Sequence, residues 1–205
     1  VNGFADCDST GSQFLGLFAK QLSRKIEIGS LVPSNTALMS VMELRDYPEF
    51  NKQYKKYAEL HHWQYKQNEW EEKEKKTYGI NVGDYFSWIN NEMALVITEP
   101  TDSTLRNDVF AVLGTSNPAS SMARLDSLSD TIAHADKSQP FTDTFMQHDI
   151  RSVDIDNVLP EVLGETFGML KKAYYTAIGN YIVFANSSGA LQIFINQHEE
   201  GNTLD

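Results

Sequence analysis

The chain of 205 residues is 41% hydrophobic and 22% charged, a composition typical of a globular protein with a sizeable core. Its formal net charge of -11 at pH 7 excludes a phosphate-tracking surface, because binding to nucleic acid or to an anionic membrane depends on Lys and Arg. The single cysteine, Cys7, excludes an internal disulfide framework.

The sequence predicts no transmembrane segment, because no stretch approaches the roughly 20 apolar residues that a spanning helix needs. No basic and then apolar leader opens the chain. Since the first residue is Val1 and not Met, we expect a processed or excised piece of a longer protein, from which any targeting signal has been removed.

The opening of the chain echoes its end. VNGFADCDSTGSQFLGLFAKQ indicates a strand end, a polar turn and a helix, as does NYIVFANSSGALQIFINQ. The corresponding helical residues are Phe14, Leu17 and Phe18 in the first segment, and Leu191, Phe194 and Ile195 in the second. The echo is either the tail of a preceding, similar unit or a chance match. We expect residues 1–30 to form an N-terminal segment and residues 31–205 a single domain.

Two strands and a long helix are predicted next. Lys25 to Ile28 indicates a short edge strand, and Thr36 to Leu44 a buried one that follows a turn. Asp46 with Glu49 forms a capping box, so a helix should begin there and run as far as Lys76. One face of this predicted helix holds Phe50, Tyr54, Tyr57, His61 and Tyr65.

Short helices and strands are predicted to alternate in the middle of the chain. The helix that follows Ser116 or Asn117 has a buried stripe of Met122, Leu125, Leu128 and Ile132. The other predicted elements are a short helix at Asn81–Ile89, strands at Glu92–Pro100 and Asp108–Gly114, one long interrupted strand at Phe141–Ile155 and a short helix at Asn157–Phe167.

The stretch from Tyr174 to Gly201 predicts a hairpin and a packed helix. Gly179-Asn180 suits a two-residue turn, because glycine tolerates positive φ. Side chains alternate along a strand, and both faces of this hairpin are largely apolar, so its strands should be central. One face is predicted to hold Tyr174, Thr176, Ile178, Tyr181, Val183 and Ala185, and the other Tyr175, Ala177, Ile182 and Phe184.

These elements predict an α+β fold with a mainly antiparallel sheet of about five or six strands. Helices should pack on one face of this sheet. The other face should be covered, or shared with a neighbouring unit.

The chain contains few residues whose type and spacing suggest catalysis or metal binding. His61 and His62 are adjacent, so on a helix they project about 100° apart and do not clamp one metal. Asp149, Asp154 and Asp156 offer oxygen ligands but lack the pattern of an EF-hand. The sequence has no G-x-S-x-G elbow, no G-x-G-x-x-G and no Walker-type loop. We therefore predict no catalytic residues, no metal site and no cofactor.

Three blocks of sequence carry a family resemblance. They read SLVPSNTALMSVMELRDYPEF, DYFSWINNEMALVITEP and KKAYYTAIGNYIVFANSSGALQIFINQHEEGNTLD. Over roughly Leu31 to Asp205, the chain resembles an uncharacterised domain of unknown function found in exported Bacteroidetes proteins. The resemblance implies a periplasmic, outer-membrane-associated or secreted location. It implies no activity, and it supplies no site residues.

The preferred hypothesis is a noncatalytic exported module that binds or scaffolds another envelope protein or a neighbouring unit of the same chain. A second hypothesis is a ligand- or glycan-binding domain that uses Trp63, Trp70 or Trp88 as stacking platforms. Trp63 and Trp70 lie seven residues apart, on a helix side that either packs on the sheet or faces a partner. The third is a hydrolase that uses the carboxylates between Asp149 and Asp156.

Overall fold

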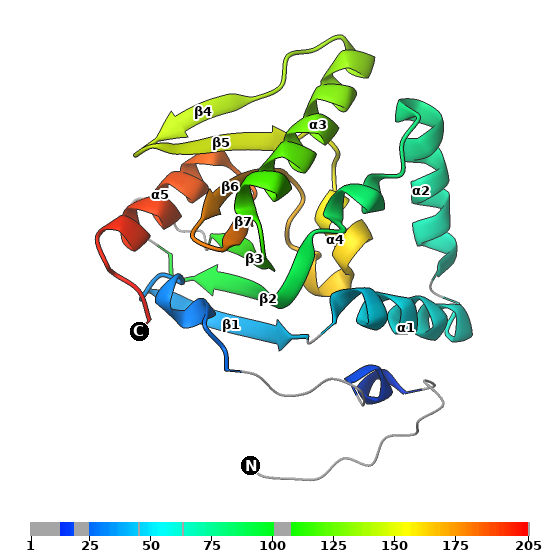
Figure 1. Ribbon diagram of the computed structural model, residues 1–205, viewed down its shortest axis with the longest axis horizontal. Coiled ribbons are helices and arrows are strands. Elements are labelled where there is room, and N and C mark those ends of the chain that lie inside the picture. Colours follow the sequence, from blue (N-terminus) through cyan, green and yellow to red (C-terminus); the bar gives the residue numbers. More distant parts are fainter. Residues whose placement is uncertain (1–12, 19–24, 45, 63, 101–107, 205) are drawn as a thin grey trace.

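The computed structural model describes residues 13–18, 25–44, 46–62, 64–100 and 108–204. They form an α+β fold around one seven-stranded sheet with the order β1-β2-β3-β7-β6-β5-β4 (Figure 1). Every neighbouring pair of strands is antiparallel. The predicted class and the antiparallel sheet are therefore confirmed, with more strands than the five or six expected.

The sheet consists of two meanders that meet at β3 and β7. The strands are β1 (Thr36–Glu43), β2 (Ile89–Thr98), β3 (Val109–Thr115), β4 (Thr142–Phe145), β5 (His148–Val153), β6 (Ala173–Ile178) and β7 (Tyr181–Ala185). After β3 the chain crosses one face of the sheet through a helix to the far edge. It then returns strand by strand, until β7 pairs with β3.

Five α-helices and four short 3-10 helices accompany the sheet in the described part of the chain. The α-helices are α1 (Tyr47–Leu60), α2 (Gln64–Tyr78), α3 (Pro118–Asp136), α4 (Val158–Leu163) and α5 (Ser188–Glu199). The 3-10 helices are η1 (Phe14–Phe18), η2 (Ile28–Ser30), η3 (Val82–Phe86) and η4 (Glu165–Phe167). None of the helices in these residues has the length and apolar character needed to cross a bilayer.

Helices cover both faces of the sheet, because both faces of its central strands are apolar. On one face, the α3-side core joins Leu125, Leu128 and Ile132 of α3 to Tyr175, Ile182 and Phe184 of the sheet. On the other, the α5-side core joins Leu191, Phe194 and Ile195 of α5 to Phe110, Ile178 and Val183. The second face is thus covered by the chain's own α5, which was expected to lie back on the sheet.

The hairpin of β6 and β7 agrees with the sequence pattern in detail. Ile178 pairs with Tyr181 across the two-residue turn, and Gly179 has a φ of +53°. The alternation also holds, since Tyr175 and Phe184 lie in the α3-side core while Ile178 and Val183 lie in the α5-side core.

Side-chain caps begin three of the helices where the sequence predicts them. The Asp46 carboxylate accepts a hydrogen bond from the Glu49 amide at 2.9 Å. The Asn117 side chain accepts one from the Ser120 amide at 3.0 Å, and the Ser187 hydroxyl accepts one from the Ala190 amide at 3.2 Å. Each cap satisfies an amide that has no partner within its helix.

The long helix predicted from Asp46 to Lys76 is in fact two helices. α1 ends at Leu60, and His62 adopts a φ of +59°, a left-handed conformation that ends a helix. α2 begins at Gln64 and runs in a different direction (Figure 1). The sequence contains no Gly or Pro between α1 and α2, so its helical pattern predicted a single continuous helix.

Two strand predictions also differ from the structure. Lys25 to Ile28 forms no strand; Ile28 begins η2 and is fully buried in the α5-side core. The stretch from Phe141 to Ile155 is a hairpin of β4 and β5, not one interrupted strand. Its turn residues Met146 and Gln147 have φ values of +47° and +68° without the Gly or Asn that usually marks such a turn.

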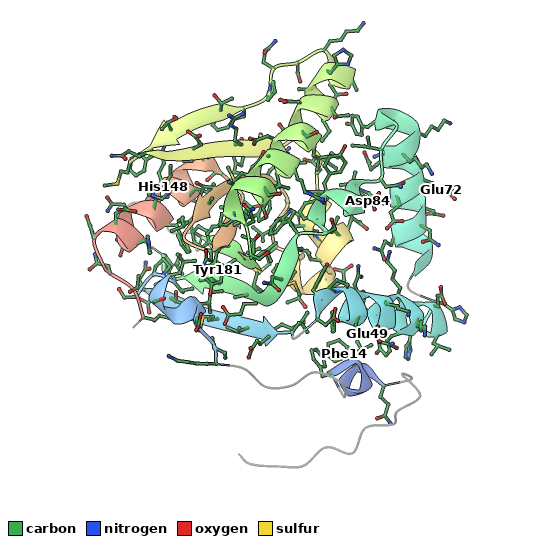
Figure 2. The ribbon with its side chains drawn as sticks, viewed as in Figure 1. Phe14, Glu49, Glu72, Asp84, His148 and Tyr181 are labelled. Carbon is green, nitrogen blue, oxygen red and sulfur yellow. The ribbon has the colours of Figure 1, made fainter. Side chains whose placement is uncertain are left out.

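The N-terminal η1 packs against α1 (Figure 2). Leu17 is buried, the Phe14 ring lies 6.1 Å from that of Tyr57, and the Phe18 ring lies 5.4 Å from that of Phe50. The part of the echo that precedes η1 lies in residues 1–12, outside the described residues.

Candidate ligand-binding site

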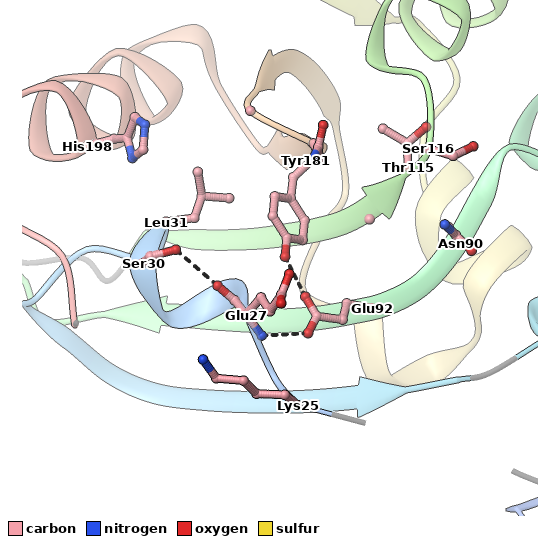
Figure 3. Close-up of a pocket in the computed structure, with 13 residues that line it drawn as sticks. Lys25, Glu27, Ser30, Leu31, Asn90, Glu92, Thr115, Ser116, Tyr181 and His198 are labelled. Atoms are coloured by element: carbon pink, nitrogen blue, oxygen red, sulfur yellow. Dashed lines mark hydrogen bonds between the residues drawn. The ribbon is translucent and has the colours of Figure 1, made fainter. Parts of the chain in front are cut away.

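A cavity of about 700 Å³ opens where β2 begins, β3 ends and β7 begins (Figure 3). The segment before η2 and the C-terminal part of α5 complete its wall. Most of the side chains that line it are polar, among them Glu27, Asn90, Glu92, Asn180, Tyr181 and His198. We call it the Glu92 cavity, because a buried carboxylate lies at its centre.

Glu92 is a buried acid at only 4% exposure. Its Oε2 accepts a hydrogen bond from the Tyr181 hydroxyl at 2.5 Å, and its Oε1 accepts one from the Glu27 backbone amide at 2.7 Å. A buried carboxylate is costly unless it is hydrogen-bonded, and bonds to a charged acceptor are among the strongest. These two bonds hold the carboxylate in one position.

Gly114 lets Glu92 and Tyr181 meet across the strand that separates them. β3 lies between β2 and β7, and Gly114 pairs directly with Tyr181. A Cβ at Gly114 would lie 3.2 Å from the backbone oxygen of Glu92 and 3.3 Å from its nitrogen. The missing side chain therefore permits the close approach of β2.

Tyr181 is a hydrogen-bond donor at neutral pH. Burial raises the pKa of its phenol well above the ordinary value, and the hydrogen bond to Glu92 and the carboxylates of Glu92 and Glu27 raise it further. The phenol therefore keeps its proton and does not act as a base.

Further polar groups surround this pair. Asn90, Ser116 and Asn180 are exposed at the cavity wall. His198 lines the cavity as well, and its buried Nδ1 has no hydrogen-bond partner within the described residues. Leu31 and the ring of Tyr181 add apolar surface.

Part of the hydrogen-bonding capacity of this pair is used within the protein. Both oxygens of Glu92 already accept a hydrogen bond, and Tyr181 donates to one of them. Among the residues that the structure describes, no three His, Cys, Asp or Glu side chains group in a way that could hold a metal ion.

No protein-family model, no curated protein sequence and no solved structure matches this chain.

The tryptophans singled out in the sequence lie elsewhere. Trp70 on α2 and Trp88 after η3 are each half-buried and pack against the α3-side core. The Trp88 ring stacks on Phe86 at 6.4 Å, and its buried Nε1 has no hydrogen-bond partner in the part of the chain described. Trp63 lies outside the described residues. Neither Trp70 nor Trp88 lines the Glu92 cavity.

The aspartates of the third hypothesis are exposed, and Asp149 and Asp156 have surface partners. Asp149 accepts a hydrogen bond from the Thr144 hydroxyl at 3.1 Å. Asp156 pairs with the Lys172 ammonium at 2.5 Å.

A second cavity, of about 620 Å³, lies between α1, α2 and η3. Lys52, Lys55 and Lys56 line it together with Glu59, Glu71 and Asp84. All six residues are exposed, and their charges are of both signs, so this cavity favours neither a cationic nor an anionic ligand.

Sequence reasoning missed Glu27, Glu92 and Tyr181 as site residues. Two features of the hydrophobic alternation along the strands point to Glu92 and Tyr181. Glu92 shares its strand face with Ala94 and Val96, so a charge falls on an inward-facing position. Tyr181 shares its face with Val183 in the same way.

Proposed function

We propose that this protein is a noncatalytic binding module whose ligand occupies the Glu92 cavity. One observation carries the proposal: a buried carboxylate is fixed by two hydrogen bonds in the wall of a large polar cavity. A cavity of about 700 Å³ falls within the range of small-ligand sites, where a few placed polar groups fix the ligand.

A binding role fits the chemistry of the pair better than a catalytic one. Tyr181 holds its proton firmly, so it does not deprotonate a substrate. Glu92 is held by the Tyr181 hydroxyl and the Glu27 amide. Fixed donors and acceptors recognise a ligand with little loss of conformational entropy.

We propose an exported or envelope-associated setting on the family resemblance of residues 31–205. The partner would be another envelope protein or a neighbouring unit of the same chain. The location would be periplasmic, outer-membrane-associated or secreted.

Thermal unfolding with a panel of sugars, amino acids and amines tests the binding role. A ligand at 100 times its dissociation constant adds about 2.7 kcal/mol to the stability of the folded state, so its melting temperature should rise. In the Glu92→Gln variant the ligand-induced rise should be clearly smaller. Reproducible turnover of any panel compound, abolished by Glu92→Gln or Tyr181→Phe, would contradict a noncatalytic role.

The tryptophan platform is the second candidate function. Trp70 and Trp88 are only half-buried, and the buried Nε1–H of Trp88 donates to no acceptor among the described residues. Quenching of tryptophan fluorescence by a glycan, lost in Trp70→Phe or Trp88→Phe, would favour this candidate over the Glu92 cavity.

A further inference from the structure

We infer that the ligand of the Glu92 cavity is a saccharide, bound through its hydroxyl groups by Glu92, Asn90 and Asn180 beside the ring of Tyr181. This inference rests on the proposed binding function and names the chemical class of the ligand.

The hydrogen-bonding groups of the cavity match those of a sugar. A hydroxyl both donates and accepts, and so do the amides of Asn90 and Asn180. An ionised carboxylate has about four acceptor positions, and Glu92 uses two of them for Tyr181 and Glu27. Glu92 therefore retains acceptor capacity for ligand hydroxyls.

The remaining wall completes this match. The half-buried ring of Tyr181 is fixed through its hydroxyl and offers apolar surface for the C–H groups of a sugar. The side chain of His198 adds a further polar group to the cavity wall.

Charge argues against the main alternatives. The cavity wall holds the carboxylates of Glu27 and Glu92 against the ammonium of Lys25, so together with the net charge of -11 it disfavours phosphates and other anions. A purely apolar ligand would displace water from the exposed amides of Asn90 and Asn180 without replacing its hydrogen bonds, which costs free energy. An uncharged polyhydroxyl ligand avoids both penalties.

The cavity has exposed groups at its wall and a buried acid at its centre. Asn90, Ser116 and Asn180 are exposed, whereas Glu92 is 4% exposed. This shape admits a free sugar, and it equally admits the terminal sugar of a longer glycan.

Saturation-transfer NMR with the whole chain tests the inference, using glucose, galactose, mannose, N-acetylglucosamine and their disaccharides as probes. Spermidine and inorganic phosphate serve as charged comparison probes, and a glycan array separates free sugars from terminal sugars of longer chains. At least one saccharide should bind, with about tenfold weaker affinity in Glu92→Gln and in Asn180→Ala, equal to about 1.4 kcal/mol.

The variants are chosen so that the fold survives. Gln at position 92 keeps an oxygen for the Glu27 amide, and its NH2 group faces the Tyr181 oxygen. Glu72→Gln, at an exposed position on α2 away from the cavity, is the matched control and should leave affinity unchanged (Figure 2). Melting temperatures of all variants confirm that each is folded.

Two results would overturn the saccharide inference. One is saccharide affinity that is unchanged in Glu92→Gln and Asn180→Ala. The other is an absence of saccharide binding at millimolar concentration; if spermidine then binds and loses affinity in Glu92→Gln, the binding function stands with a different ligand class. Failure of every probe, sugars and amines alike, would count against both the inference and the proposed function.

Discussion

Gly114 shapes the candidate site because it has no side chain. The positions of β2 and β7 on either side of β3 require Glu92 and Tyr181 to reach each other over this residue. A methyl group there would lie 3.2 Å from the backbone oxygen and 3.3 Å from the backbone nitrogen of Glu92, and these atoms do not move aside as a flexible side chain would. The conformational freedom of this glycine is secondary to the space that it leaves.

Gly114→Ala should therefore destabilise the protein by about 1–3 kcal/mol, the usual cost of overpacking. Urea unfolding monitored by circular dichroism measures this change. Gly83→Ala is the matched control, because a Cβ at Gly83 meets nothing within 4 Å. A Gly114→Ala protein as stable as the parent would refute the close approach of β2 and β3.

Tyr181→Phe should also cost about 1–3 kcal/mol, since it leaves the buried Oε2 of Glu92 without its donor. Tyr85→Phe, at a half-buried tyrosine outside the cavity, controls for loss of a hydroxyl. Chemical denaturation compares the two variants. Equal stabilities would mean that the Tyr181–Glu92 hydrogen bond contributes nothing to the fold.

Tyr47 makes stability depend on alkaline pH. Burial raises the pKa of its phenol from 10.0 to about 12 in the folded protein. The folded state therefore binds the phenol proton more tightly than the unfolded state does. The stability that Tyr47 contributes is complete below pH 10 and is lost between pH 10 and 12. A pKa of about 12 in place of 10.0 corresponds to about 3 kcal/mol of unfolding free energy.

Denaturation midpoints between pH 8 and 12 should show this loss. In Tyr47→Phe the decline in unfolding free energy should be smaller by about the same 3 kcal/mol. An identical pH dependence in the parent and in Tyr47→Phe would contradict the burial of this phenol.

At the level of helices and strands, short-range sequence patterns predicted the structure correctly where each pattern fitted only one conformation. The Gly179-Asn180 turn, the alternating faces of β6 and β7 and the Asn117 cap of α3 all follow from short-range chemistry. The break after α1 and the turn between β4 and β5 did not follow, because residues with side chains adopt positive φ there. At Met146 and Gln147, the pairing of Phe145 with His148 across the turn requires these conformations against local preference.

The Met146-Gln147 turn offers a direct test of that strain. A non-glycine residue in the left-handed region costs roughly 1–2 kcal/mol, so Gln147→Gly should stabilise the protein by up to about 1 kcal/mol. Thermal unfolding measures it. Thr144→Gly, in the adjacent strand β4, should instead destabilise by about 0.5–1 kcal/mol. Destabilisation by Gln147→Gly would contradict the positive φ at this turn.

At the level of the whole molecule, the site depends on how the two meanders meet. Glu27 and Glu92 are 65 residues apart in sequence, and Glu92 and Tyr181 are 89 apart. Only the pairing of β3 with β7 brings β2 and β7 close enough for their side chains to bond. The fold class could be predicted from periodicity and turns, but this long-range meeting could not, since no local pattern records which strands become neighbours.

Amide chemical-shift mapping of the isotope-labelled protein with a bound saccharide tests the Glu92 cavity itself. Shifts should concentrate at residues 90–92, 114–116 and 179–181, which belong to three separate stretches of sequence that adjoin in the sheet. Shifts confined to the indole groups of Trp63, Trp70 and Trp88, with those three stretches unmoved, would contradict the assignment of the ligand to this cavity.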